Sequence, residues 1–131
     1  MAYLNQIDYF TIDTTGDATD FGDLTSNRNQ FTGAGSGNRG LFAAGYTGSA
    51  TVNSIEYVTF DTTGNATDFG DLLSSLYILG ACSSGIRAVF GGGYGSPDNV
   101  MAYVTIATTG NATDFGDLTV ARAGLAGLSG T

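Results

Sequence analysis

Short segments rich in β-branched and aromatic residues recur along the chain. Ile55 to Phe60 reads IEYVTF, and its relatives are Ile7 to Ile12 and Met101 to Ile106. Residues of these types favour β-strands. Nowhere is the apolar i, i+3, i+4, i+7 pattern of an amphipathic helix long enough to form one. The pattern of apolar and polar positions therefore predicts an all-β protein built of short strands.

Each of these strands leads into a turn and a second strand. The turn reads Thr-Thr-Gly followed by Asn or Asp, and Gly and Asn can take the positive φ angle that such turns need. The second strand reads Ala-Thr-Asp-Phe-Gly-Asp-Leu and begins directly after the turn. We expect the two strands to pair as an antiparallel hairpin.

Glycine- and alanine-rich segments occur in tandem pairs between the hairpins. One pair is Phe31 to Gly35 with Arg39 to Tyr46, and the other is Leu79 to Ser83 with Arg87 to Tyr94. Turn residues separate the two members of each pair. Together with the hairpins, these segments predict four short antiparallel strands per unit.

The hairpin turn and its second strand form one phrase that occurs three times, beginning at Thr14, Thr62 and Thr108. The second and third copies both read TTGNATDFGDL, and the first differs only in having Asp17 in place of Asn. A period of 46 to 48 residues is typical of units that stack on one another to bury a core. We expect a single repeat domain, residues 1–131, with repeats at approximately 7–54, 55–100 and 101–131, the last of them truncated.

The size of the unit and the placement of its side chains indicate a β-propeller. Four strands in about 46 residues make one propeller blade, in which inner strands crowd round an axis and outer strands spread apart. Small residues such as Ala43 and Gly91 gather in two strands of each period, and large ones such as Tyr57 and Phe69 gather in the other two. We therefore expect about three four-stranded antiparallel blades rather than a solenoid.

These residues resemble those of the kelch-type β-propellers. In a kelch blade, a run of small residues ends in a double glycine, and a tyrosine and a tryptophan follow. Arg87 to Tyr94 resembles the double-glycine strand, with Gly91 and Gly92 as the doublet, and Tyr57 and Phe69 stand where the tyrosine and the tryptophan would. The phrase TTGNATDFGDLT is similar to kelch-like repeats in structural proteins of bacteriophages, marine phages especially.

The chain departs from the kelch pattern at several positions. Phe replaces Trp throughout, Leu76 replaces Arg in the middle copy, and Ala43-Ala44-Gly45 weakens one glycine doublet. The resemblance nevertheless implies a set of structural anchors that recurs in each unit. These anchors are Tyr9, Tyr57, Tyr103, Phe21, Phe69, Phe115, Gly91 and Gly92.

The strand order that the resemblance implies raises a question of closure. It gives 11 strands, the last at Leu125 to Thr131, so the third blade would combine that strand with the hairpin Ile7 to Leu24. One strand of this blade is then missing unless Met1-Ala2-Tyr3 supplies a stub. Closed propellers have about 4–8 blades. We expect self-association, with a homodimer that forms a six-bladed ring as the first choice. A longer propeller, or a chain made to study repeat assembly, stays open as an alternative.

The charge of the chain limits its partners. Twelve acidic residues against four arginines, with no lysine or histidine, give a net charge of −8, which disfavours nucleic acids and anionic membranes. The first residues lack the features of a signal peptide, and no apolar run approaches the ~18 residues of a membrane span. We expect a soluble protein of undetermined location, for which the phage resemblance implies a virion.

Candidate chemistry centres on aspartate pairs of the repeated phrase. Carboxylates suit Ca²⁺, but the dense Asp/Asn alternation of a dedicated calcium loop is absent. We expect these residues to cap turns and expect no cofactor, with Ca²⁺ binding as the alternative. The pairs are Asp20 with Asp23, Asp68 with Asp71, and Asp114 with Asp117.

Other motifs have simpler explanations. Gly35 to Gly40 fits G-x-G-x-x-G, but it joins two predicted strands rather than opening a helix, so we expect a hairpin turn. Asn65 and Asn111 begin formal glycosylation sequons, yet they coincide with the repeated turn. There is no histidine base, and Cys82 lies in a small-residue strand where packing is expected. We expect no enzyme activity.

Two functions remain, and we favour a structural scaffold in a virion, an appendage or a self-assembled ring. The alternative is a module that binds a glycan or a host-surface protein. Such a module would use the loops that do not repeat, because the repeated positions build the scaffold. These loops are Ser26 to Gln30, Thr47 to Thr51, Leu73 to Tyr77 and Tyr94 to Asn99.

Overall fold

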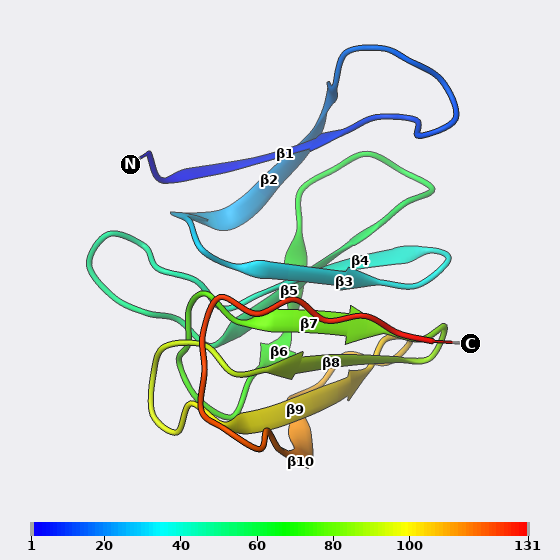
Figure 1. Cartoon of the computed structure of the whole chain (residues 1–131). Helices are drawn as coiled ribbons and strands as arrows, with labels where there is room; N and C mark the ends of the chain where they lie inside the picture. The colour runs from blue at the N-terminus through cyan, green and yellow to red at the C-terminus, as the bar shows by residue number, and fades with distance from the viewer. Residues whose placement is uncertain (1, 131) are drawn as a thin grey trace.

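The computed structural model describes residues 2–130, which form ten β-strands and no helix. The all-β prediction is thus confirmed. The strands belong to three antiparallel sheets, which do not close into a ring (Figure 1). Among the described residues, no helix is long and apolar enough to cross a membrane.

Each sheet is a simple meander of strands that are consecutive in the chain. The first sheet pairs β1 (Leu4–Tyr9) with β2 (Thr19–Arg28). The second contains β3 (Thr32–Gly35), β4 (Arg39–Ala43), β5 (Ser54–Thr59) and β6 (Thr67–Asp71). The third contains β7 (Gly80–Ser83), β8 (Arg87–Gly91), β9 (Val100–Thr105) and β10 (Thr113–Asp117).

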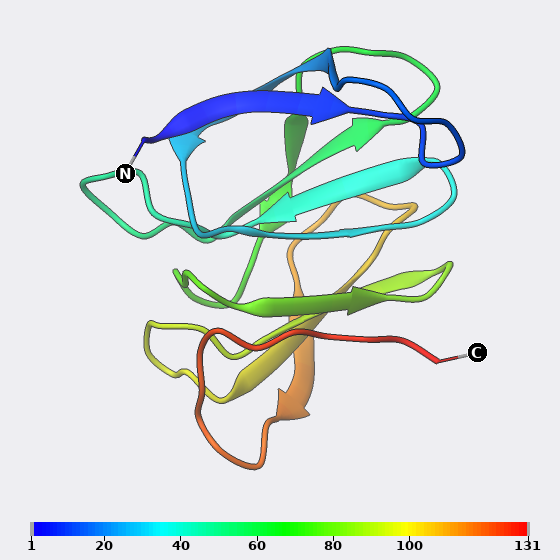
Figure 2. The same ribbon diagram turned by 45° about the horizontal axis from the view of Figure 1, so that its top comes forward.

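The three sheets stack in chain order, with the first sheet at the top of Figure 1 and the third at the bottom. Figure 2 shows the same order from a second direction. Strands β3 and β7 lie side by side, and the Ser83 hydroxyl donates a hydrogen bond to the Gly35 carbonyl at 2.7 Å. The units therefore contact one another along equivalent strands, as expected of a repeat architecture.

A ladder of backbone hydrogen bonds connects the residues just before β3, just before β7 and at the start of the C-terminal segment. Ile78 N–H donates to the Gln30 carbonyl and Gly124 N–H donates to the Ile78 carbonyl, both at 2.9 Å. These three residues occupy the same place in successive repeats. They share a left-handed backbone, with φ angles of 57°, 58° and 69° for Gln30, Ile78 and Gly124. The repeat thus extends to backbone conformation.

The C-terminal segment differs from the expectation of an eleventh strand. Residues 125–130 are extended but form no strand, and Thr131 lies outside the described residues. The segment runs beside β7, anchored by hydrogen bonds from Gly93 N–H to the Arg122 carbonyl and from Gly124 N–H to the Ile78 carbonyl (Figure 1). It thereby takes the place next to β7 that β7 takes next to β3. The proposed stub also forms no strand at Ala2 and Tyr3, and Met1 is not among the described residues.

Two apolar clusters lie between the sheets. The larger one joins the second and third sheets and includes Leu41, Ile55, Phe69, Phe90 and Ile106. The smaller one joins the first and second sheets. It contains Phe21, Leu24, Val58 and Ala66. The cores therefore lie between units rather than within any one of them.

Candidate functional site

The contacts between neighbouring sheets are the most developed feature of the molecule, and we call each contact a seam. At the first seam, the turn between β5 and β6 lies against β2. Asn65 Oδ1 accepts a hydrogen bond from Asp23 N–H at 3.0 Å, and Ala66 N–H donates to the Asp23 carbonyl at 2.8 Å. A Cβ at Gly22, whose φ is 151°, would collide with the Gly64 carbonyl. The close approach therefore requires glycine.

The second seam repeats these contacts, with the turn between β9 and β10 lying against β6. Asn111 Oδ1 accepts from Asp71 N–H at 3.0 Å, and Ala112 N–H donates to the Asp71 carbonyl at 2.8 Å. A Cβ at Gly70 would collide with the Gly110 carbonyl. The repeated phrase is thus a docking element, since its turn binds the preceding sheet and its strand receives the following turn.

The phenylalanine of the phrase lies at a β-bulge in every sheet. The register shifts at Phe69, where Ile55 pairs with Gly70 and Glu56 pairs with Asp68. The same shift occurs at Phe21 and Phe115. A bulge bends the strand locally and redirects a side chain.

Each of these phenylalanines meets a tyrosine of the neighbouring strand edge to face. The pairs are Tyr9–Phe21, Tyr57–Phe69 and Tyr103–Phe115, with ring centroids 5.7, 5.8 and 6.0 Å apart. Of the other residues predicted as anchors, Gly91 is the buried last residue of β8, and Gly92 has a positive φ of 67°.

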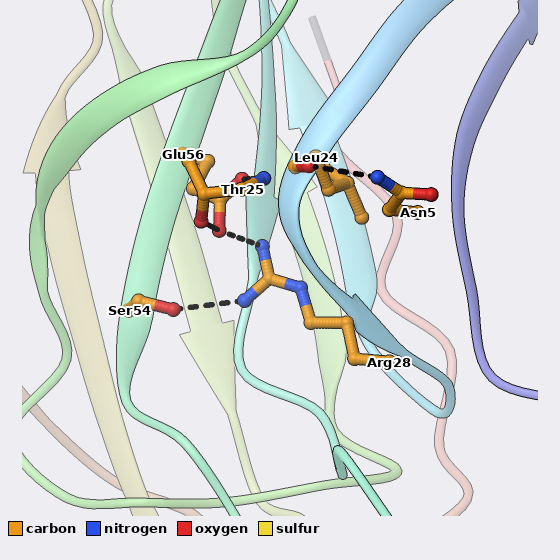
Figure 3. Close-up of polar contacts among 6 residues, drawn as sticks. All are labelled: Asn5, Leu24, Thr25, Arg28, Ser54 and Glu56. Carbon is orange, nitrogen blue, oxygen red and sulfur yellow. Dashed lines mark hydrogen bonds and ion pairs between the residues drawn. The ribbon is translucent and has the colours of Figure 1, made fainter.

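The first seam also contains four polar side chains in contact (Figure 3), which we call the polar cluster: Thr25, Arg28, Ser54 and Glu56. Arg28 Nη2 lies 2.7 Å from Glu56 Oε1, and Arg28 Nη1 donates to Ser54 Oγ at 2.8 Å. Thr25 donates to Glu56 twice, from its hydroxyl at 2.7 Å and from its backbone N–H at 2.8 Å. Strand β2 therefore supplies the cation, and β5 supplies the anion.

The ion pair of the polar cluster is buried, with Arg28 2% and Glu56 1% exposed. Burial of the guanidinium lowers the pKa of Arg28, and the Glu56 carboxylate acts in the opposite direction. Taking two charges out of water is costly, so the attraction within a buried pair largely offsets that cost rather than adding much net stability. Loss of one partner leaves a charge without compensation.

The second seam has apolar residues at the four equivalent positions. These are Leu73, Leu76, Val100 and Ala102. Leu76 and Ala102 belong to the larger apolar cluster. The two seams therefore share their backbone contacts and differ in the chemistry of these positions.

Half of a seam lies exposed at each end of the stack. Phe115 in the last strand is 50% exposed, whereas Phe21 and Phe69 are 8% and 2% exposed. A Cβ at Gly116 would meet nothing within 4 Å, in contrast to the equivalent glycines of the two seams. At the other end, Ala18 is exposed, although Ala66 and Ala112 at the same place in the phrase are buried.

A second feature is a cleft of about 450 Å³ at the end of the sheets where β3 and β7 begin. Tyr46 lies 6.0 Å from Tyr3 and 6.1 Å from Tyr77, and Tyr94 lies 5.5 Å from Tyr77, measured between ring centroids. The cleft is lined by Tyr3, Asn29, Gln30, Tyr46, Thr51 and Tyr77. Residues from three of the four non-repeated loops thus line the cleft, and Tyr94 of the fourth contacts Tyr77; the lining contains neither Arg nor Asp.

The other residues considered from the sequence take local roles. Within residues 2–130, no three Asp, Glu, His or Cys side chains come together as a metal site would require. The aspartates of the phrase contribute backbone bonds at Asp23 and Asp71, and Asp114 Oδ1 accepts from Gly116 N–H at 3.3 Å. Within the motif at residues 35–40, residues 36–38 form the turn between β3 and β4, and Cys82 is half-buried in β7.

Sequence reasoning missed the seams and the polar cluster. It treated Asn65 and Asn111 only as turn residues, although their identity in both copies is the signal of a shared contact. Glu56 gave a further signal, because it is the one acidic residue in the apolar segment Ile55 to Val58. Its partner Arg28 lies in a different unit, which a single-strand pattern does not identify.

A comparison of the chain with protein-family models and with curated proteins finds no match in either set.

Proposed function

We propose that this protein is a non-catalytic scaffold of kelch-like β-propeller blades that associates head to tail with further copies of itself. Two copies would form a closed ring of six blades. The resemblance to phage repeats supports a structural role in a virion or an appendage. The observation that carries the proposal is the seam, which occurs twice within the chain and is left half-exposed at each end.

The two exposed halves are complementary in shape and polarity. In each seam, a strand of one sheet receives a turn of the next sheet. At the last sheet, the strand with Phe115 and Gly116 is exposed, and at the first sheet the turn with Gly16 and Ala18 is exposed. Asp17 replaces the asparagine of the other turns, and its carboxylate oxygen can accept a hydrogen bond as the amide oxygen does.

Exposed apolar side chains at the first sheet support the same association. Phe10 occupies the place of Val58 and Val104, which are 5% and 4% exposed, yet it is itself 66% exposed. Phe115 is the corresponding exposed apolar residue at the opposite end. Large exposed apolar side chains at both ends of a stack are typical of an interaction surface.

The test is to block the seam at its exposed turn. The variant Ala18→Arg places a long cation where a buried alanine occurs in the two existing seams. We expect it to be monomeric by size-exclusion chromatography with light scattering, while wild type is dimeric. Gly85→Arg is the matched control, because it lies in the turn between β7 and β8 where a Cβ meets nothing within 4 Å. Dimerisation of Ala18→Arg at wild-type strength would contradict the proposal.

The tyrosine cleft favours a second candidate function, which is binding of a neutral glycan. A volume of about 450 Å³ lies within the range of ~300–1,000 Å³ for small-molecule sites. Tyrosine rings offer flat apolar faces to sugar C–H groups, and Gln30 and Thr51 offer uncharged hydrogen-bonding groups. A lining without charged side chains favours a neutral ligand.

A glycan array followed by titration tests this candidate. We expect a neutral oligosaccharide that binds with sub-millimolar affinity, and we expect Tyr77→Ala to abolish that binding. Tyr103→Ala is the control, because Tyr103 lies on β9 and is not part of the cleft lining. An array without a ligand of that affinity would contradict glycan binding and leave the scaffold proposal intact.

A further inference from the structure

The residues of the polar cluster have counterparts at both exposed ends of the chain. Arg28 and Arg122 are equivalent in sequence, because they lie the same number of residues after the first and the third copy of the phrase. Glu56 stands just before the second copy, and the equivalent residue before the first copy is Asp8. The end that follows β10 thus carries the cation of a cluster, and β1 carries the anion.

The two uncharged residues of the polar cluster, Thr25 and Ser54, also have polar counterparts at the exposed ends. Thr25 of the polar cluster corresponds to Thr119, and Ser54 corresponds to Gln6. At the second seam, by contrast, all four positions are apolar. The open ends therefore match the polar seam and not the apolar one, although the repeated phrase itself is nearly identical in all three copies.

Both charged counterparts are accessible. Arg122 and Asp8 are exposed, whereas Arg28 and Glu56 are buried. Within residues 2–130, the only ion pair is that of Arg28 with Glu56, so neither Arg122 nor Asp8 takes part in one. Arg122 Nε donates only to the nearby Val120 carbonyl, at 3.3 Å.

We propose that Arg122 of one copy pairs with Asp8 of the next copy and so rebuilds the polar cluster at the junction between copies. The partner of this surface is therefore a second copy of the chain. The inference rests on the proposed self-association and adds the residues that select the partner face. Thr119 would donate to Asp8 as Thr25 does to Glu56, and Gln6 would accept from Arg122 as Ser54 does from Arg28.

The difference between polar and apolar seams gives the association one register. If the end bearing Arg122 docked on a face with alanine at the anion position, as at Ala102, it would bury a cation without a partner. Such a mismatch is strongly unfavourable. The face with Asp8 supplies the anion that Arg122 requires. The last sheet of one copy would therefore dock on the first sheet of the next copy and not on another sheet.

A charge-reversal experiment with two single variants tests the pairing. Asp8→Arg reverses the charge at the first-sheet end of the chain, and Arg122→Asp reverses the charge at the opposite end. Each variant alone places like charges at the junction, so we expect its dimer to dissociate at least about 10-fold more readily than wild type. Mixed one to one, the variants present Arg122 to Asp8 at one junction and the reversed pair at the other. We expect the mixture to recover a heterodimer of near wild-type strength, measured by light scattering and sedimentation.

Controls keep this experiment decisive. Asp61→Arg makes the same charge change at an exposed turn residue away from the ends, and we expect it to dimerise at least as well as wild type. Circular dichroism checks folding, and Asp8→Asn is a milder variant with the same expected direction.

The outcomes separate the two proposals. A monomeric wild type overturns both the self-association and the pairing. A dimeric wild type with single variants that dimerise equally well overturns only the pairing. Single variants that are monomeric and stay monomeric when mixed also overturn the pairing.

Discussion

At the level of single residues, the two seams show the same backbone contact with opposite side-chain chemistry. Arg28 and Glu56 form a buried ion pair at the first seam, whereas Leu76 and Ala102 at the second belong to the larger apolar cluster. The fold therefore tolerates either solution at one structural position. This gives a direct way to separate the stability of a seam from its specificity.

We predict that the protein keeps its stability when both charged residues of the polar cluster are replaced together, but not when only one of them is replaced. Glu56→Ala leaves Arg28 buried without a counterion, and we expect a loss of about 3–5 kcal/mol in the free energy of unfolding. The double variant Arg28→Leu/Glu56→Ala copies the second seam, and we expect a stability within about 1 kcal/mol of wild type or above it. Urea unfolding followed by circular dichroism measures both values. A double variant as unstable as the single one would contradict this interpretation.

At the same scale, the sequence shows which residues are special but not what they contact. The identity of Asn65 and Asn111 is visible, yet their hydrogen bonds to the preceding sheet depend on how the units stack. The four arginines are equally visible, but among the described residues only Arg28 forms an ion pair. Long-range pairing of this kind is set by the arrangement of whole sheets.

At the level of elements, the strands follow the apolar pattern closely. Predicted segments such as Ile55 to Phe60 and observed strands such as β5 (Ser54–Thr59) differ by a residue or so at their ends. The N-terminal strand differs more, because β1 begins at Leu4, where it pairs with Arg28 at the end of the long β2. The expected final strand is not formed by residues 125–130, and the backbone hydrogen bonds that anchor the described C-terminal segment lie before these residues, at Arg122 and Gly124.

We predict that the same substitution has different effects in two copies of one element. Phe69→Ala removes a buried ring at a seam, and we expect a loss of about 3–5 kcal/mol. Phe115→Ala removes a half-exposed ring at the same bulge, and we expect a loss of about 1 kcal/mol in a chain that cannot dimerise. Both are measured by thermal unfolding in the Ala18→Arg background. Equal losses of stability in the two variants would contradict the interpretation that contact with the next sheet stabilises the buried ring of Phe69.

At the level of the whole molecule, charge opposes self-association and the exposed seam halves favour it. Each copy carries a net charge of −8, so copies repel one another over distances of roughly a Debye length, ~10 Å at 0.1 M salt. Added salt screens this repulsion, while the proposed Arg122–Asp8 pair, once buried at a junction, would be screened less. We therefore predict that dimerisation strengthens between 0.05 and 0.5 M sodium chloride, by roughly ten-fold or less. Sedimentation at several salt concentrations measures this, and a dimer that dissociates as salt is added would contradict it.

The whole-molecule arrangement is also where sequence reasoning reached its limit. The period of the repeated phrase predicted stacked four-stranded units, and the second and third sheets confirm that count of strands. Ring closure does not follow from the period, because it also depends on the angle between neighbouring sheets and on the surfaces at the two ends of the stack. The sequence resemblance implies that Phe115 is a structural anchor, and in the single chain its side chain is half-exposed.

The central claim is that two copies of this chain associate head to tail and close. Light scattering coupled to size-exclusion chromatography, over a range of protein concentrations, tests it most directly. We predict a mass of about twice the 13.3 kDa of one chain, reached as concentration rises and not exceeded. A well-folded protein that stays at 13.3 kDa at every concentration would contradict association, and a mass that grows without limit would contradict closure.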